Sequence, residues 1–223
     1  MANDYFRFKQ FTVSQSMCAM KVGTDGTLLG AWAHGGRRVL DIGTGTGLIA
    51  LMMAQRFPEA SVVGIDIDGD AVCQARQNAA RSPFAGRVCI ALCDVACCLG
   101  SYDCIVCNPP YFVDSLASPD ARRTMARHAG SLTYATLMRH ACRLLTDDGQ
   151  LSLVIPFDCR QHLETEAVLC GLFKTRECAV RTTPAKMARR YLLAFRKHPL
   201  PLERTELVIG SDDYQQLVND FYL

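Results

Sequence analysis

The sequence lacks any long apolar run. No stretch approaches the ~18 consecutive apolar residues that a membrane-spanning helix needs. The first seven residues, Met1 to Arg7, include Asp4 and Arg7 and no apolar segment typical of a signal peptide. We therefore expect a cytoplasmic protein that does not enter a membrane. At 223 residues and 49% hydrophobic composition, the chain is long enough for one substantial core.

The chain also lacks a strong overall charge. Its formal net charge of +2 excludes nucleic-acid binding by bulk positive charge alone. Basic residues are nevertheless concentrated in one segment, residues 171–200, where Glu177 is the single acid. That segment predicts a local basic surface. Its basic residues are Lys174, Arg176, Arg181, Lys186, Arg189, Arg190, Arg196 and Lys197.

Twelve cysteines give no pattern of a secreted disulfide scaffold, because such scaffolds are small and exported. Cys104 and Cys107 have the spacing of zinc ligands but lie in a predicted strand. Residues three apart in a strand point to opposite faces, so we predict packing cysteines and no metal site.

Between residues 37 and 156, short β-branched runs alternate with amphipathic helical patterns, which predicts an α/β fold with a mostly parallel sheet. Asp147-Asp148-Gly149 predicts a turn after the last helix of this region. The expected strands are residues 37–42, 61–66, 87–92, 102–107 and 150–156, and the expected helices are 48–56, 69–81 and 134–145.

After Pro156 we expect a helix at residues 159–170 and a hairpin formed by 172–180 and 191–196. The loop at residues 112–132 is long for a compact domain, and long loops are often functional. We expect a single domain over residues 1–223, with a core at 34–200, an N-terminal extension at 1–33 and a C-terminal extension at 201–223.

A glycine-rich turn follows the first strand of this core. Asp41 is the acid at the end of the strand, and the turn contains Gly43, Gly45 and Gly47, directly before a predicted helix. Alternating glycines allow the backbone to approach a ligand closely. The third glycine comes one residue too early for the G-x-G-x-x-G pattern of dinucleotide sites. Asp41 suits a cationic group, such as the ammonium of a methionine moiety, better than a pyrophosphate.

Three more acids follow strand ends. Asp66 ends the second strand, about 20 residues after the turn, where a carboxylate binds ribose hydroxyls. Asp68 is expected to cap the next helix. Asp94, after the third strand, is either an adenine-binding acid or a turn residue.

Asn108-Pro109-Pro110-Tyr111 follows the fourth strand, at the edge where α/β sheets bind ligands. The Asn108 side-chain oxygen and the Pro109 carbonyl can accept the N–H groups of an exocyclic amine as its nitrogen attacks a methyl group. Pro110 stiffens the turn, and Tyr111 offers a ring on which a base can stack.

These motifs resemble the class I methyltransferases with D-x-G-x-G-x-G and N-P-P-Y. More closely, the chain looks like the bacterial tRNA-1(Val) adenine-37 N6-methyltransferase family, and the similarity spans nearly the whole sequence. It is carried further by Phe11-Thr-Val-Ser-Gln15, by the segment from Lys21 to Trp32, and by the ending from Tyr214 to Leu223.

The resemblance implies a Rossmann-like class I methyltransferase fold. Its mostly parallel sheet has seven strands, with an antiparallel last strand between the fifth and sixth and helices on both faces. It further implies S-adenosyl-L-methionine as the cofactor, with Lys21, Thr24 and Asp25 over it. Cofactor-binding roles then fall on Lys21, Thr24, Asp25, Asp41, Gly43, Gly45, Gly47, Asp66, Asp94 and Asn108.

The implied fold brings the loop before the last strand to the active-site edge, where Lys186, Arg189 and Arg190 would bind RNA phosphates. Arg122, Arg123 and Arg127 in the long loop are further candidates for RNA binding. His128 is a candidate proton acceptor, although an ordinary loop histidine is the stronger interpretation. The target base must be unpaired or flipped, as in an anticodon loop.

The favoured function is therefore N6-methylation of an adenine in tRNA by an enzyme that we expect to be monomeric. A glutamine N5-methyltransferase acting on release factors, a guanine N2-methyltransferase acting on ribosomal RNA, and a non-catalytic cofactor-binding module remain as alternatives. The glycine spacing disfavours a nicotinamide-dependent oxidoreductase.

Overall fold

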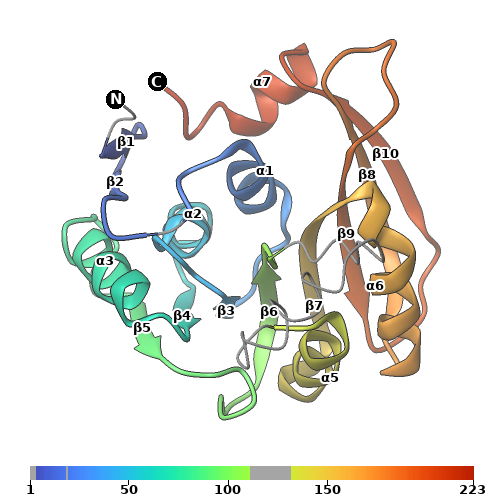
Figure 1. The fold of residues 1–223 in the computed structure, drawn as a ribbon, viewed down its shortest axis with the longest axis horizontal. Coiled ribbons are helices and arrows are strands. Elements are labelled where there is room, and N and C mark those ends of the chain that lie inside the picture. Colours follow the sequence, from blue (N-terminus) through green and yellow to red (C-terminus); the bar gives the residue numbers. More distant parts are fainter. Residues whose placement is uncertain (1–3, 19, 111–131) are drawn as a thin grey trace, which may run out of the picture.

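An eight-stranded sheet forms the centre of the molecule (Figure 1). The computed structural model describes residues 4–18, 20–110 and 132–223. The order of strands across the sheet is β10-β8-β9-β7-β6-β3-β4-β5. The strands are β3 (Arg38–Ile42), β4 (Ser61–Asp66), β5 (Val88–Leu92), β6 (Tyr102–Cys107), β7 (Leu145–Pro156), β8 (Phe173–Arg181), β9 (Arg190–Arg196) and β10 (Glu203–Val208).

The sheet has the expected parallel core. β3 pairs in parallel with β4 and β6, while β5 and β7 extend the two sides in the same direction. β9 lies antiparallel between β7 and β8, as the resemblance implies. The expected number of seven strands was wrong, because β10 adds an eighth strand parallel to β8.

Helices cover both faces of the sheet (Figure 1). One buried cluster contains side chains of the first three helices, and the other contains side chains of the next two. The sheet thus separates two layers of apolar packing. The helices are α1 (Thr24–Trp32), α2 (Leu48–Arg56) and α3 (Gly69–Ala80) on one face, and α5 (Tyr134–Leu144) and α6 (Phe157–Leu169) on the other.

The predicted helix boundaries follow local sequence signals. The Asp68 side chain accepts the backbone N–H of Asp70 and caps α3, as expected. Thr133 caps α5 in the same way, through the N–H of Thr136. The predicted turn at residues 147–149 was wrong, because these residues lie within β7. The pairing of β7 with β6 shifts register there, between Tyr102 and Cys104.

The two extensions pack together beside α1. A short hairpin of β1 (Tyr5–Arg7) and β2 (Thr12–Ser14) lies near the start of the chain, and α7 (Asp212–Val218) lies near its end. The Lys9 backbone N–H donates to the Phe221 carbonyl at 2.8 Å, and the Phe8 and Phe221 side chains are both buried. No helix among the described residues is long and apolar enough to cross a membrane.

Candidate functional site

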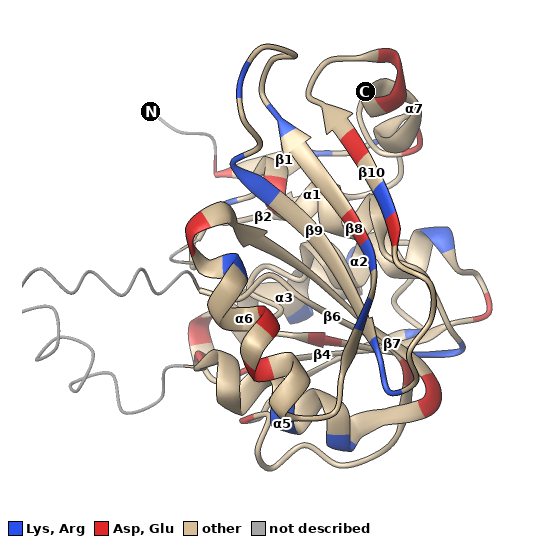
Figure 2. Cartoon of the chain, turned by 90° about the vertical axis from the view of Figure 1, so that its right-hand side faces the viewer, with Lys and Arg blue, Asp and Glu red and all other residues tan. Residues whose placement is uncertain are grey.

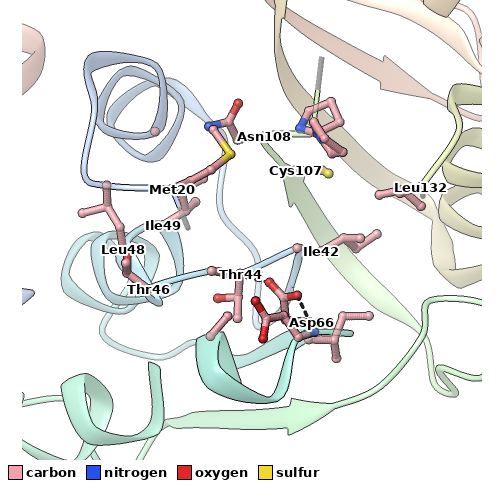
Figure 3. A pocket seen from close by; sticks show the side chains of 18 of the residues that line it. Met20, Ile42, Thr44, Thr46, Leu48, Ile49, Asp66, Cys107, Asn108 and Leu132 are labelled. Atoms are coloured by element: carbon pink, nitrogen blue, oxygen red, sulfur yellow. Dashed lines mark hydrogen bonds between the residues drawn. The ribbon is translucent and has the colours of Figure 1, made fainter. Parts of the chain in front are cut away.

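A cavity of about 940 Å³ opens at the carboxyl ends of β3, β4 and β6. This is the sheet edge at which α/β folds bind ligands. Asn108 and Asp66 lie on opposite sides of the cavity, with Ile42 and Thr44 between them in this view (Figure 3). Predicted site residues in its wall are Lys21, Thr24, Asp25, Gly43, Gly45, Asp66, Asp94, Asn108, Pro109 and Pro110.

The three glycines of the turn all have positive φ angles, of 69° at Gly43, 53° at Gly45 and 81° at Gly47. A Cβ atom added to Gly43 or Gly45 would meet no atom within 4 Å. These two glycines therefore leave open space in the wall of the cavity. A Cβ at Gly47 would lie 3.3 Å from the Cβ of Ala75, so this glycine permits close packing of α2 against α3. Gly47 is not in the cavity wall.

Asp41 does not reach the cavity either, so the structure does not support its predicted contact with a ligand ammonium. Its side chain is fully buried and points behind the turn. The carboxylate accepts the Thr44 hydroxyl at 2.6 Å and the Ala50 backbone N–H at 3.1 Å. Burial raises the pKa of Asp41 to about 7, although these two hydrogen bonds oppose the shift. Asp41 thus stabilises the glycine-rich turn from the side that faces away from the cavity.

Asp66 has the geometry expected of a ribose-binding acid. Its two carboxylate oxygens accept the backbone N–H groups of Gly45, at 2.9 Å, and Asp68, at 3.0 Å. The side chain is half-buried and lines the cavity. Because a carboxylate has about four acceptor positions, these bonds orient Asp66 and leave it able to accept two hydroxyl donors.

Asp94 is a turn residue whose position is also compatible with adenine binding. Its carboxylate accepts the backbone N–H of Ala96 at 2.8 Å, which makes it a turn residue, and it also lines the cavity. Asp68, predicted as a helix cap, lines the cavity too.

The Asn108-Pro109-Pro110 turn leaves β6 at the cavity wall. Pro109 is buried, whereas Asn108 is half-buried and Pro110 is exposed. The turn is therefore packed from behind and open towards the cavity. The remaining candidates Tyr111, Arg122, Arg123, Arg127 and His128 lie outside the described residues.

The start of α1 and the segment before it cover one side of the cavity, through Thr24 and Asp25 in the helix and Lys21 before it. An ion pair joins this cover to the hairpin of β8 and β9. Nε of Arg190, the first residue of β9, lies 2.9 Å from Oδ2 of Asp25. Arg190 was expected to bind RNA, but the structure commits its side chain to Asp25.

Lys186 and Arg189 belong to the loop between β8 and β9 and are exposed. The loop stands at the cavity end of the sheet, because Arg190 pairs with Pro156 at the end of β7. Lys and Arg residues, coloured blue, lie along this projecting hairpin (Figure 2). Lys186 and Arg189 thus lie at the cavity end of the sheet, where basic residues were expected.

Sequence reasoning missed several apolar wall residues, including Met20, Ile67 and Leu132. Ile67 could have been found from the sequence, because it is an apolar residue directly after Asp66, the acid that ends β4. It is 55% exposed, as expected for an apolar residue in the wall of an open cavity. Met20 and Leu132 have no comparable motif.

Cys104 and Cys107, which have the spacing of zinc ligands, do not lie together. Both are buried in β6, but they belong to the apolar clusters on opposite faces of the sheet. Their side chains therefore point apart. Within the described ranges, no group of three His, Cys, Asp or Glu residues is arranged to hold a metal ion.

Comparison with known proteins gives consistent matches. Residues 23–187 match the family described as "Methyltransferase small domain". The chain is 45% identical to the tRNA1(Val) (adenine(37)-N6)-methyltransferase of Bacteroides thetaiotaomicron and 46% identical to that of Phocaeicola vulgatus, covering 100% of this chain and 99% of each relative. A predicted O-methyltransferase of Agrobacterium tumefaciens shares the fold, with a TM-score of 0.67 at 20% identity over 88% of this chain and 96% of that one.

Proposed function

The chain belongs to the tRNA1(Val) (adenine(37)-N6)-methyltransferase family, and from this premise we propose that it methylates N6 of adenine 37 in the anticodon loop of its tRNA. It is an S-adenosylmethionine-dependent enzyme. The observation that carries this function is the position of Asn108-Pro109-Pro110 in the wall of the same cavity as Asp66 and the open glycine turn. Methyl donor and acceptor nitrogen can meet only where such features converge.

The cavity suits the cofactor in size and chemistry. Its volume of about 940 Å³ is large enough for a cofactor together with a base. Gly43 and Gly45 leave space against the backbone, and Asp66 is oriented to accept the ribose hydroxyls. Asp94 and Ile67 offer an acceptor and an apolar surface for adenine. When bound, S-adenosylmethionine supplies an electrophilic methyl group.

Asn108 and Pro109 prepare the acceptor. The lone pair of an exocyclic amine is delocalised into its ring, so the nitrogen is a poor nucleophile. The Asn108 side-chain oxygen and the Pro109 carbonyl accept the two N–H groups and favour tetrahedral geometry at nitrogen. Pro110 restricts the turn, and the buried Pro109 ring anchors it. Tyr111 is proposed to stack on the target base.

The substrate assignment separates this enzyme from the alternatives. Two full-length relatives carry names that specify the adenine and the tRNA, which favours this substrate over a glutamine amide or a guanine. The exposed Lys186 and Arg189 suit RNA phosphates at the cavity edge. We also propose that the enzyme acts in the cytoplasm, as a single-domain monomer and without a metal ion.

The test is transfer of labelled methyl groups from S-adenosylmethionine to unfractionated tRNA, with ribosomal RNA and a release factor as parallel acceptors. We expect N6-methyladenosine in tRNA by nucleoside mass spectrometry. Asn108→Ala should lose at least 100-fold in rate, on the order expected for removal of a transition-state acceptor, while it still binds the cofactor.

Asn219→Ala is the matched control, because it makes the same change at an exposed position beyond the end of α7. It should methylate tRNA at the wild-type rate. Label that enters only the release factor or ribosomal RNA would replace the proposed substrate, and an unchanged rate for Asn108→Ala would refute the role of Asn108.

A further inference from the structure

Phe157 is an exposed aromatic residue at the cavity end of the sheet, directly after the strand next to the one that leads into Asn108. It is the first residue of α6, directly after β7, and its side chain is 49% exposed. β7 is the neighbour of β6 in the sheet, and Cys107 pairs with Leu153 in parallel. The two strands are about 5 Å apart in the sheet, and β7 continues to Pro156, so its exit lies three residues, about 10 Å, beyond the exit of β6. Asn108 follows one exit, and Phe157 follows the other.

The Phe157 ring is held in place although it is half-exposed. It packs against Tyr191, with ring centroids 6.2 Å apart. The Arg160 guanidinium lies over the Tyr191 ring at 4.6 Å from its centroid. Arg160 is itself fixed by Glu164 at 2.7 Å and Glu177 at 2.9 Å. A surface aromatic with this support loses little side-chain entropy when it binds a planar group.

Phe157 is joined to a loop that carries exposed basic residues. Its backbone N–H donates to the Arg189 carbonyl at 3.1 Å, so the loop between β8 and β9 is bonded directly to this residue. Arg189 and Lys186 of that loop are exposed. An exposed aromatic ring together with basic residues on the same surface is the combination that binds single-stranded nucleic acid, through stacking on the ring and pairing with phosphate.

Other exposed aromatic residues do not share this setting. Among the described residues, Tyr5 and Phe6 lie in the N-terminal hairpin, and Phe173 begins β8 at the opposite edge of the sheet. Phe157 is also absent from the wall of the cavity. It is therefore suited to a base outside the cavity, not to the base that is methylated.

We propose that Phe157 is a stacking site for the nucleobase next to the target adenine, and that Arg189 binds the adjoining phosphate. This inference rests on the proposed function, because it needs an RNA substrate whose target base is withdrawn into the cavity. When a base leaves its stack, its neighbour loses a stacking partner. Phe157 replaces that partner and lowers the cost of flipping.

The test compares Phe157→Ala, Phe157→Leu and Phe157→Tyr with Phe173→Ala as the control at the opposite edge. Steady-state methylation and binding of the substrate tRNA are measured for each full-length variant. We expect Ala and Leu to weaken tRNA binding on the order of tenfold, and Tyr to retain it, because stacking needs a ring. The three Phe157 variants should bind the cofactor with wild-type affinity, measured by calorimetry. Phe173→Ala should bind tRNA as the wild type does.

A tRNA with an abasic nucleotide on one or the other side of the target adenine makes the test specific. If Phe157 stacks on that base, the penalty of Phe157→Ala should disappear on one of the two abasic tRNAs. Equal penalties on intact and both abasic tRNAs would overturn the proposal, as would wild-type binding by Phe157→Leu. A change in sedimentation of Phe157→Ala would instead assign the ring to contact with a second copy of the chain. Failure of the wild type to methylate any tRNA would remove the proposed function as well.

Discussion

Asp41 shows how one buried acid couples the cofactor turn to pH. Burial raises its pKa to about 7, and the nearby charge of Asp66 acts in the same direction. Its pKa in the unfolded chain is near 3.9. Between about pH 4 and pH 7, the folded protein therefore retains a proton that the unfolded chain has released. Stability should fall as the pH rises through this window and become level above it.

Asp41→Asn removes this ionisation while it keeps the shape of the side chain. We expect the free energy of unfolding of the variant to rise relative to the wild type by about 3 kcal/mol from pH 5 to pH 8. Urea titrations at both pH values measure the difference. For the control Asp148→Asn, at an exposed position, the free energy of unfolding should change with pH as it does in the wild type. If the free energy of unfolding of Asp41→Asn also follows the wild type with pH, Asp41 is already ionised in the folded protein.

The sequence placed Asp41 at a strand end and predicted that it faces the cofactor, whereas the structure places it outside the cavity wall. Strand alternation contains the answer in retrospect: Ile42 lines the cavity, so Asp41 faces the other side, together with Val39. Asp66 was predicted correctly as a wall residue because it ends its strand. The packing role of Gly47 depends on Ala75, which is distant in sequence, and no local pattern could reveal it.

At the scale of elements, the Asp25–Arg190 ion pair links the cofactor cover to the β8–β9 hairpin. The pair is half-exposed, so it should stabilise the fold by only about 0.2–1 kcal/mol. Its larger effect should be on the position of the segment that carries Lys21 and Thr24. We expect Arg190→Gln to weaken cofactor binding several-fold and to leave global stability nearly unchanged. Calorimetric titration with the cofactor measures this.

Arg181→Gln is the matched control for that prediction. Arg181 pairs with Glu206 at 2.8 Å, between β8 and β10 and away from the cavity wall. Its loss should not change cofactor affinity. Asp25→Asn should weaken binding as Arg190→Gln does, and the double variant should be no worse than either single one. Additive effects would show that the two residues act independently.

The sequence predicted elements well where apolar periodicity was strong and poorly where it was weak. The four parallel strands β3 to β6 are short apolar runs, and each was found to within one residue. β10 was missed because Glu203 to Glu206 are all exposed at the sheet edge and give no apolar pattern. The early start of β7 was missed because Asp147 and Gly149 have the composition of a turn; only Leu145 pairs with β6 before the register shift, and the regular pairing resumes at Gln150.

At the scale of the whole molecule, the packed extensions predict that the chain unfolds as one unit. Phe221 is 1% exposed and packs in the same cluster as Phe8 and Trp32. Phe221→Ala should therefore cost about 3–5 kcal/mol, although the residue lies far from the cavity. Fluorescence of Trp32, the only tryptophan, and far-UV circular dichroism should report one coincident urea transition, at lower urea than in the wild type. Leu223→Ala, at an 80% exposed position, should change stability by less than about 0.5 kcal/mol. Two separate transitions would divide the chain into independently folding parts and contradict a single domain.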